Sequence, residues 1–475
     1  MIRRLPSLSL VCALGCGASA DGTTAAAIRV VPAEVGLFGH EVVELHLPTP
    51  RLPARPKPVV RVAGALAYDV VWVSPDVLRV TVQGAPQPGP ADVVVEIGET
   101  RLETPGALRY RPPREPALGR LIATGGSLTE GVHDTTVDVD GQTTAAAAVI
   151  ARQAGAYLPL PLVPRGIIPG YTAASFRHDC TVATEPDIAG FLDSLLDPAT
   201  GEYSVRRGRI DPDIEAFNVA IGGETLADQR EGGAGAKSVL ENLTWNVDAS
   251  SPIVGPPVPQ IGRVKALAAG ASHSTILSLD LASNDVLGSL STNDTGFSLE
   301  TITPPEQFRK DAEVILGELA ALPAEVFIAD IPYVDFKPDF QDHLARMRAR
   351  GKDADGAVAA LRARTDALNA ILAEVGGRFR NIHVLPIAAR VKEIARDGVV
   401  VGGERLDVSR FGGLLGFDDT HFTRTGYALV ADYFIQQMNQ ILGTSIPAPD
   451  VEAIHAADPQ SPSALRALGF SCKKP

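Results

Sequence analysis

Between residues 27 and 112, apolar and polar positions alternate with a period of two. Three runs show the alternation most clearly: Val43, Leu45 and Leu47; Leu78, Val80 and Val82; and Val93, Val95 and Ile97. Proline and glycine separate the runs. A strand with apolar side chains at alternate positions buries one face, so the pattern predicts a small all-β sandwich of short strands.

The pattern changes after a linker at residues 111–116, in which three prolines favour an extended backbone. Short apolar runs then alternate with helical segments, which is typical of a parallel sheet with crossover helices. The five runs are Leu121–Ala123, Ala216–Ile221, Thr275–Leu281, Val326–Ile331 and Ile382–Ile387. Five such strands predict a flavodoxin-like three-layer α/β/α sandwich.

Local signals place some helix ends within this second region. Thr303 as N-cap, Pro304 at the first position and Glu306 three residues after the cap predict a capping box. Gly351 and Gly356 are expected to divide the helical stretch at residues 340–375 into two helices. The segment at residues 230–262 is rich in Gly, Pro and Ser, and we expect a long loop there that borders the site.

The first residues have the three parts of an export signal: Arg3 and Arg4, an apolar stretch, and small residues around Cys16. The apolar stretch is shorter than the ~20 residues of a membrane-spanning helix. Residues 13–16 (Ala-Leu-Gly-Cys) resemble a bacterial lipobox, although Leu usually stands where Ala13 is, and this favours lipidation of Cys16. Residues 18–20 (Ala-Ser-Ala) offer an ordinary signal-peptidase site instead.

These observations divide the chain into an export signal at 1–26, the β-sandwich at 27–112, the α/β domain at 117–447 and a C-terminal tail at 448–475. We expect an exported protein held at the outer membrane or cell surface by its lipid anchor only, or otherwise a periplasmic or secreted one. Cys180 and Cys472 would be its remaining thiols, either paired in a disulfide or free. The net charge of −13, with scattered lysines and arginines, argues against nucleic acid as a partner.

Ser127 follows the first apolar run of the α/β domain, directly after Gly125 and Gly126. Ligands bind at the carboxyl ends of the strands in an open α/β sheet, so a side chain here faces the crevice. Ser127 is therefore placed to act as a nucleophile. By itself, serine in a glycine-rich strand-to-helix turn is more often a helix cap, so the assignment depends on other parts of the chain.

Asp418 and His421 supply the partners that a nucleophilic serine needs. His421 lies three residues after Asp418, in a segment that leads into an apolar-faced helix. The carboxylate can accept a hydrogen bond from one ring nitrogen, which leaves the other nitrogen to take the serine proton. Asp419 is the alternative partner, but the three-residue spacing favours Asp418.

Two further blocks lie between the serine and the histidine, each directly after a predicted strand. Residues 217–225 read Phe-Asn-Val-Ala-Ile-Gly-Gly-Glu-Thr, and residues 281–285 read Leu-Ala-Ser-Asn-Asp. With the Gly-Gly-Ser-Leu-Thr block and the Asp-x-x-His-Phe-Thr block, this ordered set resembles the conserved blocks of the SGNH/GDSL esterases and lipases. The resemblance covers roughly residues 119–447, and residues 411–418 resemble more narrowly large bacterial lipoproteins of that family.

The resemblance implies a role for each block. The triad would be Ser127, His421 and Asp418, and the oxyanion donors would be Ser127, Gly223 and Asn284, with Gly222 as a neighbouring alternative to Gly223. Glycine lets the backbone approach the oxyanion, and asparagine supplies a neutral donor. The β-sandwich resembles an IPT/TIG immunoglobulin-like module in its pattern of proline and glycine, and such modules serve as spacers or binding surfaces.

The chain departs from the family pattern at two positions. Gly126 stands where an aspartate usually precedes the nucleophile, and Ala282 stands where a glycine usually lies two residues before the asparagine. Gly126 lacks a carboxylate that would brace the turn, and Ala282 crowds the oxyanion loop. Either change could loosen the site.

No metal or other cofactor is expected. Asp134, Asp138 and Asp140 with Gly141 fit only part of a calcium-loop pattern, so a solvated acidic loop is the preferred interpretation. His133 and His178 have no partner at metal-ligand spacing.

We therefore expect hydrolysis of carboxylic esters through an acyl-enzyme intermediate, with a lipid, an acetylated sugar or a small acyl ester as substrate. Two alternatives remain. The Gly126 and Ala282 departures would suit an inert cell-surface binding lipoprotein, and the same residues could transfer an acyl group to a sugar or alcohol acceptor.

Overall fold

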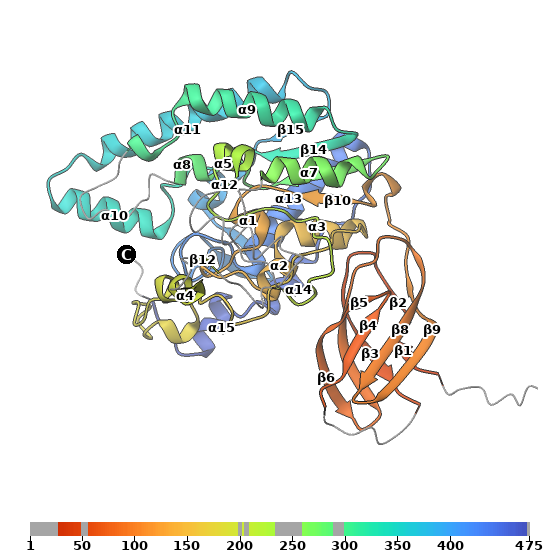
Figure 1. The fold of residues 1–475 in the computed structure, drawn as a ribbon. Coiled ribbons are helices and arrows are strands. Elements are labelled where there is room, and N and C mark those ends of the chain that lie inside the picture. The colour runs from red at the N-terminus through yellow and green to blue at the C-terminus, as the bar shows by residue number, and fades with distance from the viewer. Residues whose placement is uncertain are drawn as a thin grey trace, which may run out of the picture.

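The computed structural model describes residues 27–48, 56–197, 202–203, 209–232, 259–287 and 299–472. Cys16 and the predicted export signal lie outside the described residues, as does most of the predicted loop at residues 230–262. The described part is mixed α/β, as predicted: β-strands form the first region, and a parallel sheet with helices forms the second (Figure 1).

The first region contains two sheets. One has the order β1-β3-β7-β6 and the other β2-β9-β8-β4-β5. Their strands are β1 (Arg29–Val31), β2 (Glu34–Val35), β3 (Gly39–His46), β4 (Val59–Val62), β5 (Ala65–Leu66), β6 (Tyr68–Ser74), β7 (Val77–Gln83), β8 (Gly89–Ile97) and β9 (Thr100–Tyr110). The alternating apolar runs lie in β3, β7 and β8 and turn inward to one shared core, where Leu45, Val80 and Val93 have no solvent exposure. Full burial of such a side chain contributes ~1.5–3 kcal/mol.

The second region is built on four parallel strands in the order β10 (Leu121–Ala123), β13 (Ser274–Ser278), β14 (Ala324–Ala329) and β15 (Ile382–Leu385). Helix α9 (Pro305–Ala320) packs beside α11 (Ala354–Gly376), and α3 (Ala146–Ala154) packs beside α13 (Arg424–Leu442). The two pairs lie on opposite faces of the sheet (Figure 1). The helices thus cover the two faces of the sheet and leave the ends of its strands uncovered.

The remaining described elements connect this framework. They are η1 (Pro116–Leu118), α1 (Ser127–Glu130), α2 (Val139–Thr144), η2 (Ala173–Ser175), α4 (Ile188–Leu195), β11 (Leu196–Asp197), β12 (Glu202–Tyr203), α5 (Leu226–Glu231), α7 (Gln260–Ala269), α8 (Asn284–Leu287), η4 (Leu299–Thr301), α10 (Pro338–Ala349), α12 (Ile387–Asp397), β16 (Val399–Val401), β17 (Glu404–Leu406), α14 (Val451–Ala456) and α15 (Pro462–Ala467). None of the described helices has the length and apolarity that a membrane span requires.

The prediction of a fifth strand at Ala216–Ile221 is wrong. The segment runs beside β10 and forms one isolated parallel bridge with it, between Ala123 and Asn218. One further backbone bond, from Ile221 N to Gly125 O at 3.0 Å, joins the two segments beyond the bridge, but no regular strand forms. The neighbouring β10 has only three residues, which limits the ladder. The Asn218 side chain donates to Thr129 O at 2.8 Å. The segment is therefore anchored to α1 as much as to the sheet.

The predicted capping box at Thr303 is also wrong. Helix α9 begins at Pro305 with Pro304 as its N-cap, and no side chain caps it. The Thr303 hydroxyl instead donates to Asp285 Oδ1 at 2.6 Å, because a buried carboxylate lies within its reach. A long-range contact has replaced the local one that the sequence indicated.

The division of residues 340–375 into two helices is confirmed, with a refinement. Gly351 lies in the break between α10 and α11 with φ of +67°, a conformation that suits glycine. Gly356 does not interrupt the helix. It lies in the first turn of α11, where its amide donates to the N-cap Asp353 at 2.8 Å.

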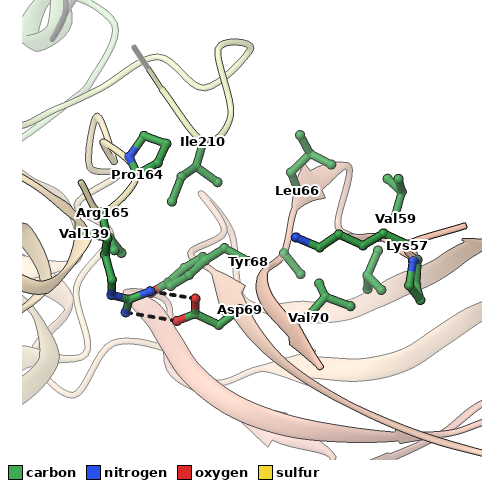
Figure 2. A pocket seen from close by; sticks show the side chains of 13 residues that line it. Lys57, Val59, Leu66, Tyr68, Asp69, Val70, Val139, Pro164, Arg165 and Ile210 are labelled. Atoms are coloured by element: carbon green, nitrogen blue, oxygen red, sulfur yellow. Dashed lines mark hydrogen bonds and ion pairs between the residues drawn. The ribbon is translucent and has the colours of Figure 1, made fainter. Parts of the chain in front are cut away.

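The two regions meet in an interface that is partly apolar and partly ionic. Phe38 and Tyr68 of the β-strand region belong to the core of the α/β region, and the Arg152 guanidinium lies 5.3 Å from the centre of the Phe38 ring. Figure 2 shows a neighbouring pocket, in which Arg165 makes a two-pronged ion pair with Asp69. None of the predicted triad residues lines this pocket, so it is a feature of the interface and not the candidate active site.

The segment that the sequence treats as a C-terminal tail is folded, which corrects the prediction. It contains α14 and α15, and Asp458 accepts hydrogen bonds from the Thr425 amide and hydroxyl at the start of α13. A disulfide joins Cys180 to Cys472. The end of the described chain is therefore fixed covalently and by hydrogen bonds to the α/β region.

Candidate active site

Ser127 lies in the turn between β10 and α1, at the first position of that short helix. It is 9 % exposed, so the side chain lies just below the surface. Gly125 has φ of +130°, and a Cβ there would come within 2.5 Å of Ser278 Oγ on β13. The glycine therefore lets β10 turn sharply beside its neighbour and places the serine at the carboxyl end of the strand.

His421 and Asp418 form a hydrogen-bonded pair. The His421 Nδ1 atom lies 2.6 Å from Asp418 Oδ2, and Asp418 Oδ1 accepts from the amides of Thr420 and His421. Burial alone would raise the pKa of Asp418, but the neighbouring His421 and these amides outweigh burial and hold the pKa well below its usual range. Asp418 therefore stays ionised beside the imidazole, leaving Nε2 for proton transfer.

Asp419, the alternative partner, is engaged elsewhere. Its carboxylate pairs with the Arg410 guanidinium, and its backbone has φ of +57°. Burial raises the pKa of Asp419 to about 6 despite this ion pair. Of the two aspartates, Asp418 is the one that contacts the histidine.

Contacts between the loops bring the Ser127 turn against the Asp418–His421 loop. The Val132 amide donates to Ser127 O at 2.9 Å, and the Val132 carbonyl accepts from the buried Tyr427 hydroxyl at 2.6 Å. The Thr135 amide donates to Asp418 Oδ2 at 2.6 Å, although Thr135 itself has φ of +67°. The segment after α1 thus helps to fix the carboxylate that orients the histidine.

Asn284 also lies beside the turn that holds Ser127. A Cβ at Gly126 would come within 2.6 Å of Asn284 Nδ2, which places this amide directly against the residue before Ser127. One of the two N–H groups on Nδ2 is directed to Glu224 O at 3.0 Å, which fixes the amide in place. The other remains as a donor at the carboxyl end of the sheet.

The structure distinguishes Gly223 from Gly222. The Gly222 amide donates to Glu130 Oε2 at 2.6 Å, so it is already used. Gly223 is exposed with φ of +82°, and its N–H donates to no atom of the described residues. A Cβ at Gly222 would lie 3.4 Å from Ser127 Cβ, so the pair of glycines stands next to the serine. Of the two amides, that of Gly223 is therefore the one with no bond to the described residues.

The acidic segment after α1 differs from the solvated loop that the sequence predicts. Asp134 and Asp138 are buried, and the His133 ring lies between them, with Nδ1 3.2 Å from Asp134 and Nε2 3.0 Å from Asp138. Burial lowers the pKa of His133, but its two carboxylate partners outweigh burial and raise the pKa to about 10. Asp140 pairs with Arg165. These charges are thus neutralised within the fold, and the described residues contain no cluster of three or more His, Cys, Asp or Glu side chains that could hold a metal ion.

The sequence missed three residues that support the site: Asp280, Glu130 and Thr135. Each acts through contacts with segments remote in sequence, for example across 154 positions between Asp280 and Gly126. No local spacing marks them. Ala282, which replaces the usual glycine, is buried and lies outside the left-handed region of backbone conformation, so the alanine is accommodated without strain.

Comparisons with known proteins assign no family. No protein-family model matches the chain, and no curated protein matches it. Among solved structures, the chain is similar to a crystal structure of a Bacillus subtilis protein from a structural genomics programme, at 13 % identity and a TM-score of 0.27, over 87 % of this chain and 84 % of that one.

Proposed function

We propose that this protein is a serine hydrolase of the SGNH/GDSL type that cleaves carboxylic esters. The observation that carries the proposal is the ionised Asp418 bonded to His421 in a loop packed against the turn that holds Ser127. The site also contains donors for an oxyanion next to the serine. A nucleophile, a base with its orienting group and an oxyanion site are the parts that acyl transfer needs.

The arrangement of the chain supports the same proposal. With the segment at 216–221 counted beside β10, the spatial order of the segments is 2-1-3-4-5 in chain order, which is the flavodoxin-like order. Ligands bind in such folds at the carboxyl ends of the strands, where Ser127, Asn284 and Gly223 lie. The two facing sheets before this domain suit an immunoglobulin-like module of the IPT/TIG type.

The proposed reaction begins when Ser127 Oγ attacks the ester carbonyl carbon. His421 Nε2 takes the hydroxyl proton, and Asp418 stabilises the resulting imidazolium. The Ser127 and Gly223 amides and Asn284 Nδ2 donate to the oxyanion, and loss of one such donor typically costs ~3 kcal/mol of transition-state stabilisation. His421 then gives its proton to the departing alcohol, and water releases the acid from Ser127 by the same steps.

The proposal includes an export signal and a lipid at Cys16. The residue pattern at 13–16 supports lipidation, and the Cys180–Cys472 disulfide supports an oxidising compartment, since disulfides are rare in the cytosol. The enzyme would then act on esters at or near a membrane surface to which only its lipid anchor attaches it.

The test is hydrolysis of p-nitrophenyl esters, from acetyl to palmitoyl, by the wild-type chain and by Ser127→Ala. We expect turnover by the wild type and a loss of about 10⁴-fold or more in Ser127→Ala, because the nucleophile is removed. Ser74→Ala, on β6 and outside the α/β region, is the matched control and should retain full activity.

Two further measurements complete the test. A fluorophosphonate probe should label Ser127 in the wild type and in the control but not in Ser127→Ala. If the folded wild-type protein neither hydrolyses any ester nor reacts with the probe, the proposal fails and an inert surface protein becomes the better account. Product analysis with a sugar or alcohol acceptor present separates hydrolysis from acyl transfer, which uses the same residues.

A further inference from the structure

Asp280 is a buried carboxylate that contacts the turn between β10 and α1, which holds Ser127 and is called the nucleophile turn below. It lies two residues after β13, is 2 % exposed, and stands four positions before Asn284. Its Oδ1 atom accepts from the Gly126 amide at 3.0 Å, the Thr129 amide at 3.2 Å and the Thr129 hydroxyl at 2.6 Å. Its Oδ2 atom accepts from the Leu128 amide at 2.7 Å.

None of these four hydrogen bonds involves the Ser127 amide. Asp280 accepts from residues 126, 128 and 129, whereas the Ser127 N–H donates to no atom of the described residues. A carboxylate that bonds the amides on both sides of the nucleophile fixes the turn and leaves the nucleophile's own amide for the oxyanion. Burial raises the pKa of the Asp280 carboxyl, and the hydrogen bonds from Thr129, Leu128 and Gly126 oppose that rise.

Asp280 also accounts for the glycine at position 126. A Cβ at Gly126 would lie 2.8 Å from Asp280 Oδ2 and 2.6 Å from Asn284 Nδ2. The space that a side chain at 126 would need is therefore filled by a carboxylate and an amide from the segment after β13. The backbone of Gly126 has φ of −101°, which other residues also adopt, so contact and not conformation requires the glycine.

We propose that Asp280 is the positioning residue of the nucleophile turn, and that it supplies from the segment after β13 the bracing carboxylate that position 126 lacks. This inference rests on the proposed serine hydrolase function. Asp280 touches neither the substrate nor the reacting atoms. It acts by holding Ser127 and its amide in the geometry that the transition state needs, so its loss should reduce kcat more than it changes KM.

The experiment compares full-length Asp280→Ala, Asp280→Asn and the wild type. Alanine removes all four bonds, whereas asparagine can keep the three to Oδ1 and lose only the one from Leu128. We expect kcat to fall about 100-fold in Asp280→Ala, the size of effect that small misplacement of a reacting group produces. In Asp280→Asn we expect a fall of about tenfold, with KM within about twofold in both variants.

The matched control is Asp211→Asn. Asp211 is 4 % exposed and accepts from the amides of Leu66 and Asp213, but it lies at the interface between the two regions. The Asp211→Asn variant therefore loses a buried carboxylate that accepts amide hydrogen bonds, but this carboxylate does not contact the nucleophile turn. Its kcat should equal that of the wild type.

A second readout separates positioning from loss of folded protein. Positioning predicts that the fluorophosphonate reacts more slowly with Ser127 in Asp280→Ala but reaches the same final labelling per molecule. An unchanged labelling rate with fewer labelled molecules would mean that Asp280 only maintains the fold, and the inference would be overturned. It would equally be overturned if Asp280→Ala kept wild-type kcat. A wild type that is itself inactive and unlabelled would instead refute the proposed function.

Discussion

Gly126 stands directly before Ser127, the proposed nucleophile, at the position where the resembled family usually carries aspartate. From the sequence alone, this glycine looks like the loss of a bracing group. In the structure, the absence of a side chain at Gly126 leaves room for the Asp280 carboxylate and the Asn284 amide, which occupy the space beside it. The meaning of the residue is therefore set by two side chains more than 150 positions away.

This geometry gives a prediction that runs against the family pattern. Gly126→Asp, which restores the usual residue, should lower ester turnover by about 100-fold, because its Cβ displaces both Asp280 and Asn284. Gly317→Ala on α9 is the control, since a Cβ there has no neighbour within 4 Å among the described residues. Steady-state kinetics on a p-nitrophenyl ester would decide. Turnover equal to or above the wild type in Gly126→Asp would show that the space is not filled as described.

The elements most open to prediction from sequence were those whose pattern repeats within a few residues. The alternation in β3, β7 and β8 and the break near Gly351 follow from side-chain periodicity and glycine, which act locally. The strand at 216–221 was not formed as predicted because its neighbour β10 has only three residues with which to pair. The Thr303 cap failed because the Thr303 hydroxyl is bonded to the remote Asp285.

The candidate site divides in the same way. Ser127, His421 and Asp418 could be found because each stands in a short motif with a chemical reason for its spacing. Asp280 and Glu130 could not be found, because no local sequence pattern indicates which distant amide will donate a hydrogen bond to an acidic side chain. The choice between Gly222 and Gly223 likewise required the Glu130 contact.

The loop that follows α1 should respond to alkaline pH through His133. Its pKa is raised in the folded state to about 10, from 6.5 in the unfolded chain, because Asp134 and Asp138 outweigh its burial. A raised pKa means that the stabilisation is complete below about pH 6.5, declines as the pH rises further, and is lost above about pH 10. His133→Gln should therefore lower the unfolding free energy at pH 6 and have a much smaller effect near pH 10.

Denaturant unfolding of both proteins at several pH values measures this difference. The variant's deficit should shrink steadily between pH 7 and pH 10. A deficit that stays constant over this range would mean that the His133 ring contributes through packing and not through its charge.

At the scale of the whole molecule, the two regions are held together by side chains and not only by the linker. Phe38 on the β-strand side is 1 % exposed and lies in the core of the α/β side. Arg165 pairs with Asp69 across the same interface, but both side chains are more than 40 % exposed, and such pairs contribute little. The apolar contact should therefore dominate the docking.

Phe38→Ala should loosen this docking without impairing the site. We expect trypsin to cut the linker after Arg114 about tenfold faster or more, since truncating a buried phenylalanine costs ~3–5 kcal/mol. Val42→Ala, on β3 but 54 % exposed, is the control and should be cut at the wild-type rate. Ester turnover should be unchanged in both. Equal cleavage of the two variants would show that the linker alone fixes the arrangement.

The Cys180–Cys472 bond also has a consequence for the order of events during synthesis and folding of the protein. Its cysteines are 292 positions apart, so the first thiol leaves the ribosome long before its partner exists. At 5–20 residues per second, the interval is roughly 15 to 60 seconds. During that time the only other cysteines already made are Cys12 and Cys16, in the predicted export signal. The native link can therefore close only as a late step of maturation, after the whole α/β region has been synthesised.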